Sequence, residues 1–153
     1  METYSASAAY AGALAAEVAS LGSRRVGLGS SLGGLALLHA HRLQPSSFDG
    51  LFLQSGSYFK RRTDPQEARF GRFARVDRFV GTVLRGRDPH PVPTTITCAF
   101  DEENYDNNAA VAKALAAQDY PVEFHAARGG HDWPTWRRAV EAHLPELLRR
   151  AWR

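Results

Sequence analysis

The sequence predicts an α/β protein with about four parallel strands and flanking helices. Short apolar runs alternate along the chain with longer segments in which apolar residues recur every three or four positions. This alternation is typical of parallel sheets, because each helix carries the chain back to the start of the next strand. The length of 153 residues suits one domain, spanning residues 1–153.

The first half of the chain supplies two helices and two strands. Apolar residues spaced four, four and three positions apart predict a helix over about 5–21, namely Tyr10, Leu14, Val18 and Leu21. A short apolar strand is expected at 24–29, and the helix that follows it should end near 43, before the breaker at 44–47. A continuous apolar run predicts a buried strand at 50–54.

The second half repeats the alternation. The expected elements are a helix, a strand, a helix and a strand, at 74–84, 94–99, 106–118 and 121–126. Two glycines, Gly129 and Gly130, introduce a last helix. Pro145 is expected to kink or split that helix, because proline lacks a backbone N–H and its ring crowds the preceding turn.

The composition excludes several classes of function. No apolar stretch approaches the roughly 18 residues needed to cross a bilayer, so no membrane partner is expected. The net charge of +3 is too small to indicate a nucleic-acid partner. Cys98 stands alone within an apolar run, which predicts a buried and inert thiol.

A basic segment lies between Lys60 and Arg87, where nine basic residues stand against three acidic ones. Four arginines recur there at every third position and are called the arginine stripe: Arg69, Arg72, Arg75 and Arg78. On a helix they would form a slowly drifting row. The row has two interpretations, a solvated helix face or an electropositive rim that attracts an anionic substrate.

The most informative motif is Gly29–Gly33, a G-x-S-x-G sequence between an apolar strand and a helix. It nominates Ser31 as a nucleophile, because such a turn lifts Oγ clear of the sheet. The Leu32 N–H then lies at a helix N-terminus, where it can stabilise a developing oxyanion. Side chains two positions either side of the serine would collide, so Gly29 and Gly33 are both expected for steric reasons.

The same glycines allow a second interpretation, a dinucleotide-binding turn that starts at Gly27, with Asp49 as the acid that binds a ribose. In that fold the acid ends the second strand. Asp49 instead precedes the apolar run at 51–53. We therefore favour the nucleophile.

A serine nucleophile needs a base, and the base needs an acid to orient it. In hydrolases with this turn, the acid and then the histidine follow in loops after later strands. Of the six histidines, only His131 lies in a glycine-containing loop after a predicted strand, so it is the expected base. Its neighbour Asp132 is a poor partner, because adjacent loop side chains diverge. The acid is expected among Asp101, Glu102 and Glu103.

Four sequence blocks, in this order, resemble an esterase family of the α/β-hydrolase superfamily that includes esterase D-like enzymes, enterochelin esterases and feruloyl esterase domains. The blocks are Val26–Gly34, Phe52–Phe59, Glu102–Asn108 and Gly129–Trp136. The resemblance implies a serine carboxylic-ester hydrolase that forms an acyl-enzyme, with Ser31 as nucleophile and His131 as base. The family's acid stands three residues after a glycine. In this chain Ala99 occupies the position of that glycine. Counting three residues on, the resemblance points to Glu102 as the acid.

The resemblance also implies the partners of the site. The chemistry needs no cofactor and no metal, and its substrate is a small-molecule ester. The arginine stripe favours an anionic or phenolic, siderophore-like ester. Two alternatives stay open, an acyltransferase with the same triad and a non-catalytic binding module that keeps the fold.

Complete members of the family carry about four further strands ahead of these elements, and one of the loops there supplies a second oxyanion donor. We therefore expect the chain to be the C-terminal half of an α/β-hydrolase domain. Its first strand would then have an open edge, so the chain should need the missing half or self-associate. The compartment is left open, because any export signal would precede Met1.

Overall fold

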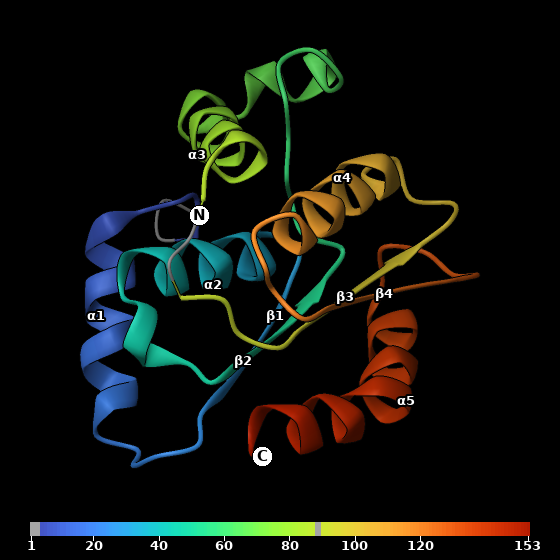
Figure 1. The fold of residues 1–153 in the computed structure, drawn as a ribbon. Coiled ribbons are helices and arrows are strands. Elements are labelled where there is room, and N and C mark those ends of the chain that lie inside the picture. Colours follow the sequence, from blue (N-terminus) through green and yellow to red (C-terminus); the bar gives the residue numbers. More distant parts are fainter. Residues whose placement is uncertain (1–3, 88–89) are drawn as a thin grey trace.

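A four-stranded parallel sheet with the order β1-β2-β3-β4 forms the centre of the molecule (Figure 1). The computed structural model describes residues 4–87 and 90–153. The strands are Val26–Ser30 (β1), Gly50–Gln54 (β2), Thr94–Ala99 (β3) and Val122–Ala127 (β4). All four lie within two residues of their expected positions, and their parallel pairing confirms the α/β class.

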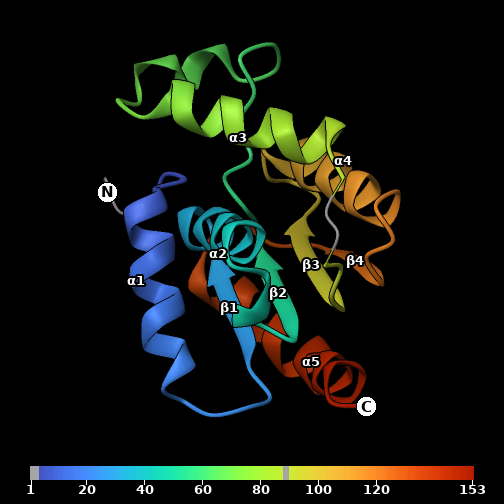
Figure 2. The same ribbon diagram turned by 60° about the vertical axis from the view of Figure 1, so that its left-hand side comes forward.

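Helices cover both faces of the sheet. Within the described residues they are Ala8–Ala19 (α1), Leu32–Leu43 (α2), Phe73–Arg85 (α3), Tyr105–Ala116 (α4) and Trp133–Ala151 (α5), with short 3₁₀ turns at Pro45–Ser47 (η1) and Pro65–Arg69 (η2). Helices α2 and α4 lie on one face and α5 on the other, while α1 packs on α2 and α3 packs on α4 (Figure 2). None of these helices is long and apolar enough to span a membrane.

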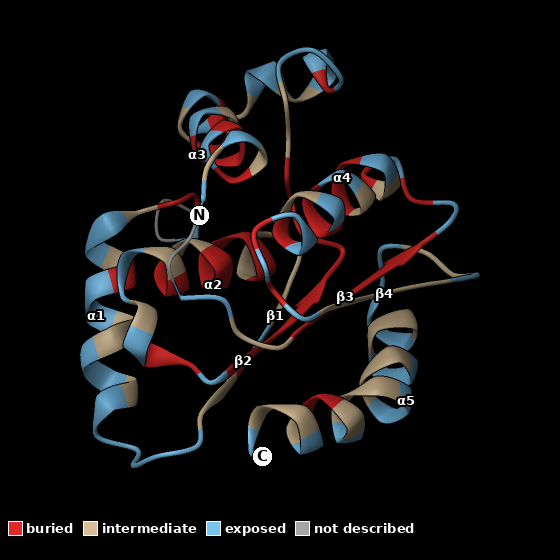
Figure 3. Cartoon of the chain, in the orientation of Figure 1, coloured by how far each residue is buried: buried red, intermediate tan, exposed pale blue. Residues whose placement is uncertain are grey.

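The core lies where α2 and α4 meet the two central strands. Strands β2 and β3 are buried along their whole length, whereas β1 and β4 are partly exposed (Figure 3). Cys98 of β3 is buried and unpaired with any other cysteine, as expected. Burial raises the pKa of its thiol to about 12, which keeps it protonated and unreactive.

The last helix shows the first of the two outcomes expected for Pro145, a kink and not a split (Figure 1). Pro145 lies inside α5, which runs unbroken from Trp133 to Ala151, so the proline does not split it. Figure 1 shows the axis of α5 changing direction part-way along its length. A bend of this kind relieves the clash between a proline ring and the carbonyl of the preceding turn.

The arginine stripe does not form a row on one helix. Arg69 ends the 3₁₀ turn η2, and Arg72 precedes α3, so only Arg75 and Arg78 lie on that helix. Those two line a cavity of about 380 Å³ between α2 and α3, together with Arg42. The row that this spacing would form on a helix is therefore absent, because α3 begins only after Arg72, close to the expected start at 74.

The outer edge of β1 is open. Within the described residues β1 pairs only with β2, so its other edge carries no ladder hydrogen bonds. Gly27 and Gly29 face α2, and Leu28 between them points to the α5 side, where 47% of it is exposed. Parallel strands are normally covered on both faces, so an apolar, uncovered edge strand favours association.

Leu28→Lys is expected to reduce self-association of the chain, because a charge on this strand opposes edge-to-edge pairing. Light scattering over a concentration series measures the effect. Leu21→Lys is the matched control, since Leu21 is 71% exposed and lies outside the sheet. A wild-type chain that stays monomeric at every concentration and melts cooperatively contradicts the expectation.

Candidate active site

Ser31 occupies a strained turn between β1 and α2. Its φ of 56° lies in the left-handed region that residues with side chains rarely adopt. The turn is anchored by its own N–H, which donates to the Gln54 carbonyl at 2.8 Å. The serine therefore stands at the carboxyl end of β1 in a backbone conformation that the surrounding structure enforces.

The turn requires a glycine at one of the two expected positions. A Cβ on Gly29 would lie 2.5 Å from the backbone oxygen of Gly33, so β1 and α2 approach each other too closely for any side chain. A Cβ on Gly33 would meet nothing within 4 Å. The expectation that both glycines are sterically required is therefore correct for Gly29 and wrong for Gly33, which lies on the open side of α2.

Gly29→Ala and Gly33→Ala form a matched pair. We expect Gly29→Ala to lower the free energy of unfolding by about 1–3 kcal/mol or more, because the clash is with backbone that cannot move aside. Gly33→Ala is expected to leave it unchanged or slightly raised, since alanine favours helix. Urea denaturation compares the two. Equal losses for both variants contradict the steric argument.

Three predicted residues meet at the carboxyl edge of the sheet. The Ser31 Oγ lies 2.9 Å from His131 Nε2, and His131 Nδ1 lies 2.7 Å from Glu102 Oε2. Each residue comes from the loop after a different strand, namely β1, β4 and β3 in that order. The other two acidic candidates, Asp101 and Glu103, are exposed at the rim of the same cavity. The geometry thus selects Glu102 as the partner of His131.

The hydrogen bonds fix the position of the imidazole proton. A carboxylate only accepts, so Nδ1 carries the proton and Nε2 presents its lone pair to Ser31. The bond to Glu102 raises the pKa of His131 above its ordinary value, more than burial lowers it. Burial alone would raise the pKa of Glu102, but hydrogen bonds from His131, the Ala99 N–H and Ser55 outweigh it and lower that pKa.

Ser57 is a further hydroxyl at the site that the sequence analysis did not single out. Its Oγ lies 3.2 Å from the Ser31 Oγ, and its side chain is buried. Because the Ser31 proton points at His131, Ser57 is the donor in this contact. The only signal in the sequence was the block Phe52–Phe59, which contains Ser57 without indicating its role.

The cavity over the site has a volume of about 440 Å³. Ser31, Ser57 and His131 line it, and Phe59 adds an aromatic wall. The charged groups at its rim are acidic, and the arginines of α3 line a different cavity. The expected electropositive rim therefore does not lie at Ser31. No cluster of side chains within the described ranges could hold a metal ion.

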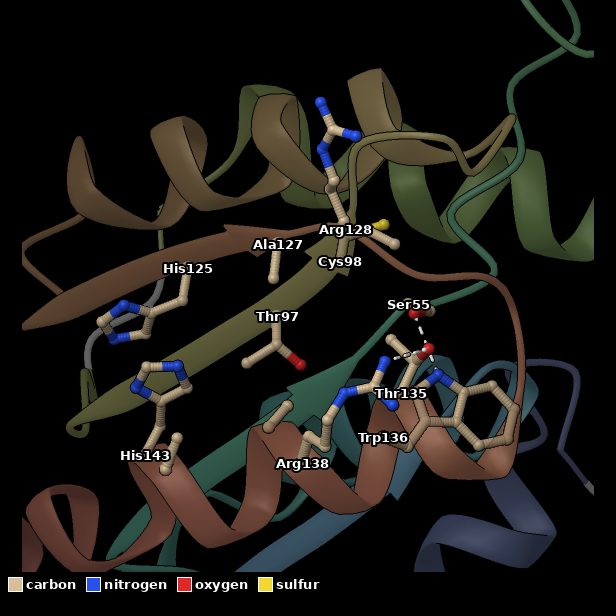
Figure 4. Close-up of a pocket in the computed structure, with 13 residues that line it drawn as sticks. Ser55, Thr97, Cys98, His125, Ala127, Arg128, Thr135, Trp136, Arg138 and His143 are labelled. Carbon is tan, nitrogen blue, oxygen red and sulfur yellow. Dashed lines mark hydrogen bonds between the residues drawn. The ribbon is translucent and has the colours of Figure 1, made fainter.

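A second cavity, of about 250 Å³, lies between β3, β4 and α5 (Figure 4). Its inner end is formed by Ser55 and Trp136, and at its outer end the rings of His125 and His143 stack 3.8 Å apart. No member of the Ser31, His131 and Glu102 set lines this cavity.

The remaining candidates have structural roles. Asp132 accepts a hydrogen bond from the Thr135 N–H at 2.8 Å and caps α5, so it does not orient His131. Asp49 accepts from the Arg25 N–H at 2.6 Å ahead of β2. Gly27 lies within β1 rather than on a turn after it, so the dinucleotide-binding interpretation has no support in the structure.

A four-stranded parallel sheet with helices on both of its faces defines an α/β fold, and here the serine stands on the turn between the first strand and the next helix. A scan against protein-family models finds no match, and neither does a search of the curated proteins. Solved structures do match. The enterobactin esterase FES from Shigella flexneri is 22% identical with a TM-score of 0.73, and the match covers 94% of this chain and 39% of that one.

Two further structures extend the comparison. A ferulic acid esterase is 21% identical with a TM-score of 0.63, and the match covers 80% of this chain and 50% of that chain. A capsule O-acetyltransferase of Neisseria meningitidis serogroup A is 14% identical with a TM-score of 0.66, over 94% of this chain and 65% of that chain. The chain thus has the fold of the C-terminal half of such esterases and spans half or less of the two esterases named here.

Proposed function

We propose that the chain carries the catalytic residues of a serine carboxylic-ester hydrolase. The observation that supports this most is the unbroken hydrogen-bonded series from Ser31 through His131 to Glu102. A serine hydroxyl is a weak nucleophile until a base removes its proton. Here the base lies within reach, and its tautomer is fixed by a buried carboxylate.

The reaction follows from these positions. The Ser31 Oγ attacks the ester carbonyl carbon while His131 Nε2 takes its proton. The carbonyl oxygen becomes an oxyanion, and the Leu32 N–H is its proposed donor, since the first N–H groups of a helix lack intrahelical partners. The tetrahedral intermediate then collapses, His131 returns the proton to the leaving alcohol, and water hydrolyses the acyl-enzyme by the same route.

The substrate is proposed to be a small, phenolic ester. The aromatic wall at Phe59 supports this, as do the names of two structural neighbours, a ferulic acid esterase and an enterobactin esterase. The anionic ester expected from the arginine stripe loses its support, because Asp101 and Glu103 stand at the mouth of the cavity. An acyltransferase that uses an alcohol in place of water is the second candidate, favoured by the likeness to the capsule O-acetyltransferase.

A fluorophosphonate probe is expected to label the chain at Ser31, because the probe reacts with a serine whose proton is accepted by a neighbouring base. Ser31→Ala should abolish labelling, as measured by mass spectrometry of the modified peptide. Ser30→Ala is the control, since Ser30 is adjacent but bonds to Gln54 instead of His131. Label that persists in Ser31→Ala, or a chain that takes up none in wild-type form, contradicts the proposal.

The rate of labelling is expected to rise with pH as His131 loses its proton, because only neutral Nε2 can accept from Ser31. The raised pKa of His131 places the midpoint above its ordinary value of 6.5. Glu102→Gln removes the charge that raises this pKa, so the midpoint should move to lower pH while the maximum rate falls roughly 10⁴-fold.

Glu103→Gln is the control for Glu102→Gln. Glu103 raises the pKa of His131 only through space, so its removal should shift the midpoint slightly and leave the maximum rate unchanged. A pH profile of labelling for both variants measures this. A Glu102→Gln rate within a few-fold of wild type contradicts the role given to Glu102.

A further inference from the structure

We infer that Ser55 and Trp136 are positioning residues that hold Glu102 in its ionised, correctly turned state. The inference rests on the proposed function, because it concerns the acid of the same site. It starts from a hydrogen-bonded series that continues beyond Glu102, through Ser55 directly after β2 and on to Trp136 in α5. Neither residue is hydrogen-bonded to Ser31. Ser55 acts through the carboxylate, and Trp136 acts through Ser55 and through its ring contact with His131.

The indole of Trp136 sets the order of donors and acceptors in this hydrogen-bonded series. The Trp136 Nε1–H donates to the Ser55 Oγ at 3.0 Å, and the Ser55 Oγ lies 2.7 Å from Glu102 Oε1. Figure 4 shows the indole nitrogen turned toward Ser55 across the inner end of the cavity. An indole N–H can only donate, and a hydroxyl has one proton. With Trp136 as its donor, Ser55 must therefore give that proton to Glu102.

The two oxygens of Glu102 consequently have different tasks. Oε1 accepts from Ser55 and from the Ala99 N–H at 2.9 Å, which leaves Oε2 for His131. Only 2% of this side chain is exposed, so water cannot replace a lost donor. A buried carboxylate stays charged only if hydrogen bonds compensate for its lost solvation.

Ser55 is itself held in a strained conformation. Its φ is 46°, its N–H donates to the Thr97 carbonyl at 2.7 Å, and its carbonyl accepts from Asn104 Nδ2 at 3.0 Å. Positive φ at a serine costs free energy and persists only where several contacts enforce it. The contacts here aim the hydroxyl at Glu102.

Trp136 also touches the other end of the acid–base pair. Its ring lies edge-on to His131, with centroids 5.0 Å apart and an interplanar angle of 82°. Its carbonyl accepts from Gln54 Nε2 at 2.8 Å, which ties the first turns of α5 to the end of β2. One tryptophan thus orients the histidine by contact and its acid through Ser55.

Two variants test the inference, with p-nitrophenyl acetate as the substrate. Trp136→Phe keeps an aromatic ring but removes the N–H, and we expect kcat to fall about tenfold with KM unchanged. Ser55→Gly accepts the positive φ but removes the hydroxyl, and a fall of about a hundredfold is expected. Trp133→Phe is the matched control, since Trp133 lies on the same helix and is 71% exposed.

The proton on His131 Nδ1 gives a readout that does not depend on turnover. Proton NMR should show its deshielded resonance in wild type and in Trp133→Phe, and a shifted or exchange-broadened resonance in Trp136→Phe and Ser55→Gly. If both variants match Trp133→Phe in kcat and in this resonance, the inference is overturned. Absent labelling of wild-type Ser31 would instead overturn the proposed function, and the resonance would still decide whether Ser55 and Trp136 position Glu102.

Discussion

The site depends on one buried carboxylate. Glu102 receives hydrogen bonds from three parts of the chain, the end of its own strand, the end of β2 and the loop after β4. Removing a carboxylate from water is costly, and these donors together offset that cost and lower its pKa. Because the donors lie on separate elements, the carboxylate is correctly placed only when the sheet has formed with its native register.

The same register brings Ser31 to the histidine. Ser31 follows β1. Its N–H donates to the carbonyl of Gln54, the last residue of β2, and its carbonyl accepts from the Ser57 N–H in the loop that follows. The close approach of α2 to β1 at Gly29 then fixes the direction in which the serine points. Ser31 and Ser55, whose hydroxyls must be aimed, are two of the five non-glycine residues with positive φ in the described part of the chain.

These features explain what could be predicted from the sequence. Ser31 and His131 are recognisable because their signals are local, a tight glycine turn and a glycine-containing loop after a strand. The choice of Glu102 over Asp101 and Glu103 needed the resemblance, since all three are carboxylates in one loop. Neither a local motif nor the resemblance indicates the roles of Ser55, Ser57 and Trp136.

The roles of those residues arise from contacts between distant elements, such as the bond that joins positions 136 and 55. The arginine row and the steric need for Gly33 are absent from the structure for local reasons. Spacing alone cannot show that Arg69 lies in a 3₁₀ turn and Arg72 ahead of α3, nor that Gly33 faces open space. Periodicity indicates which residues share a face only if the element itself is continuous.

The open edge of β1 and the chemistry at Ser31 are linked by geometry. The serine directly follows β1, so any strand added in parallel along that edge would end beside the Leu32 N–H. The loop leaving such a strand is where a second oxyanion donor would stand. The exposed face of Leu28 would be covered by the same addition. Under the proposed function, a strand pairing with β1 would therefore bury Leu28 and bring a further backbone N–H beside the Leu32 N–H in one step.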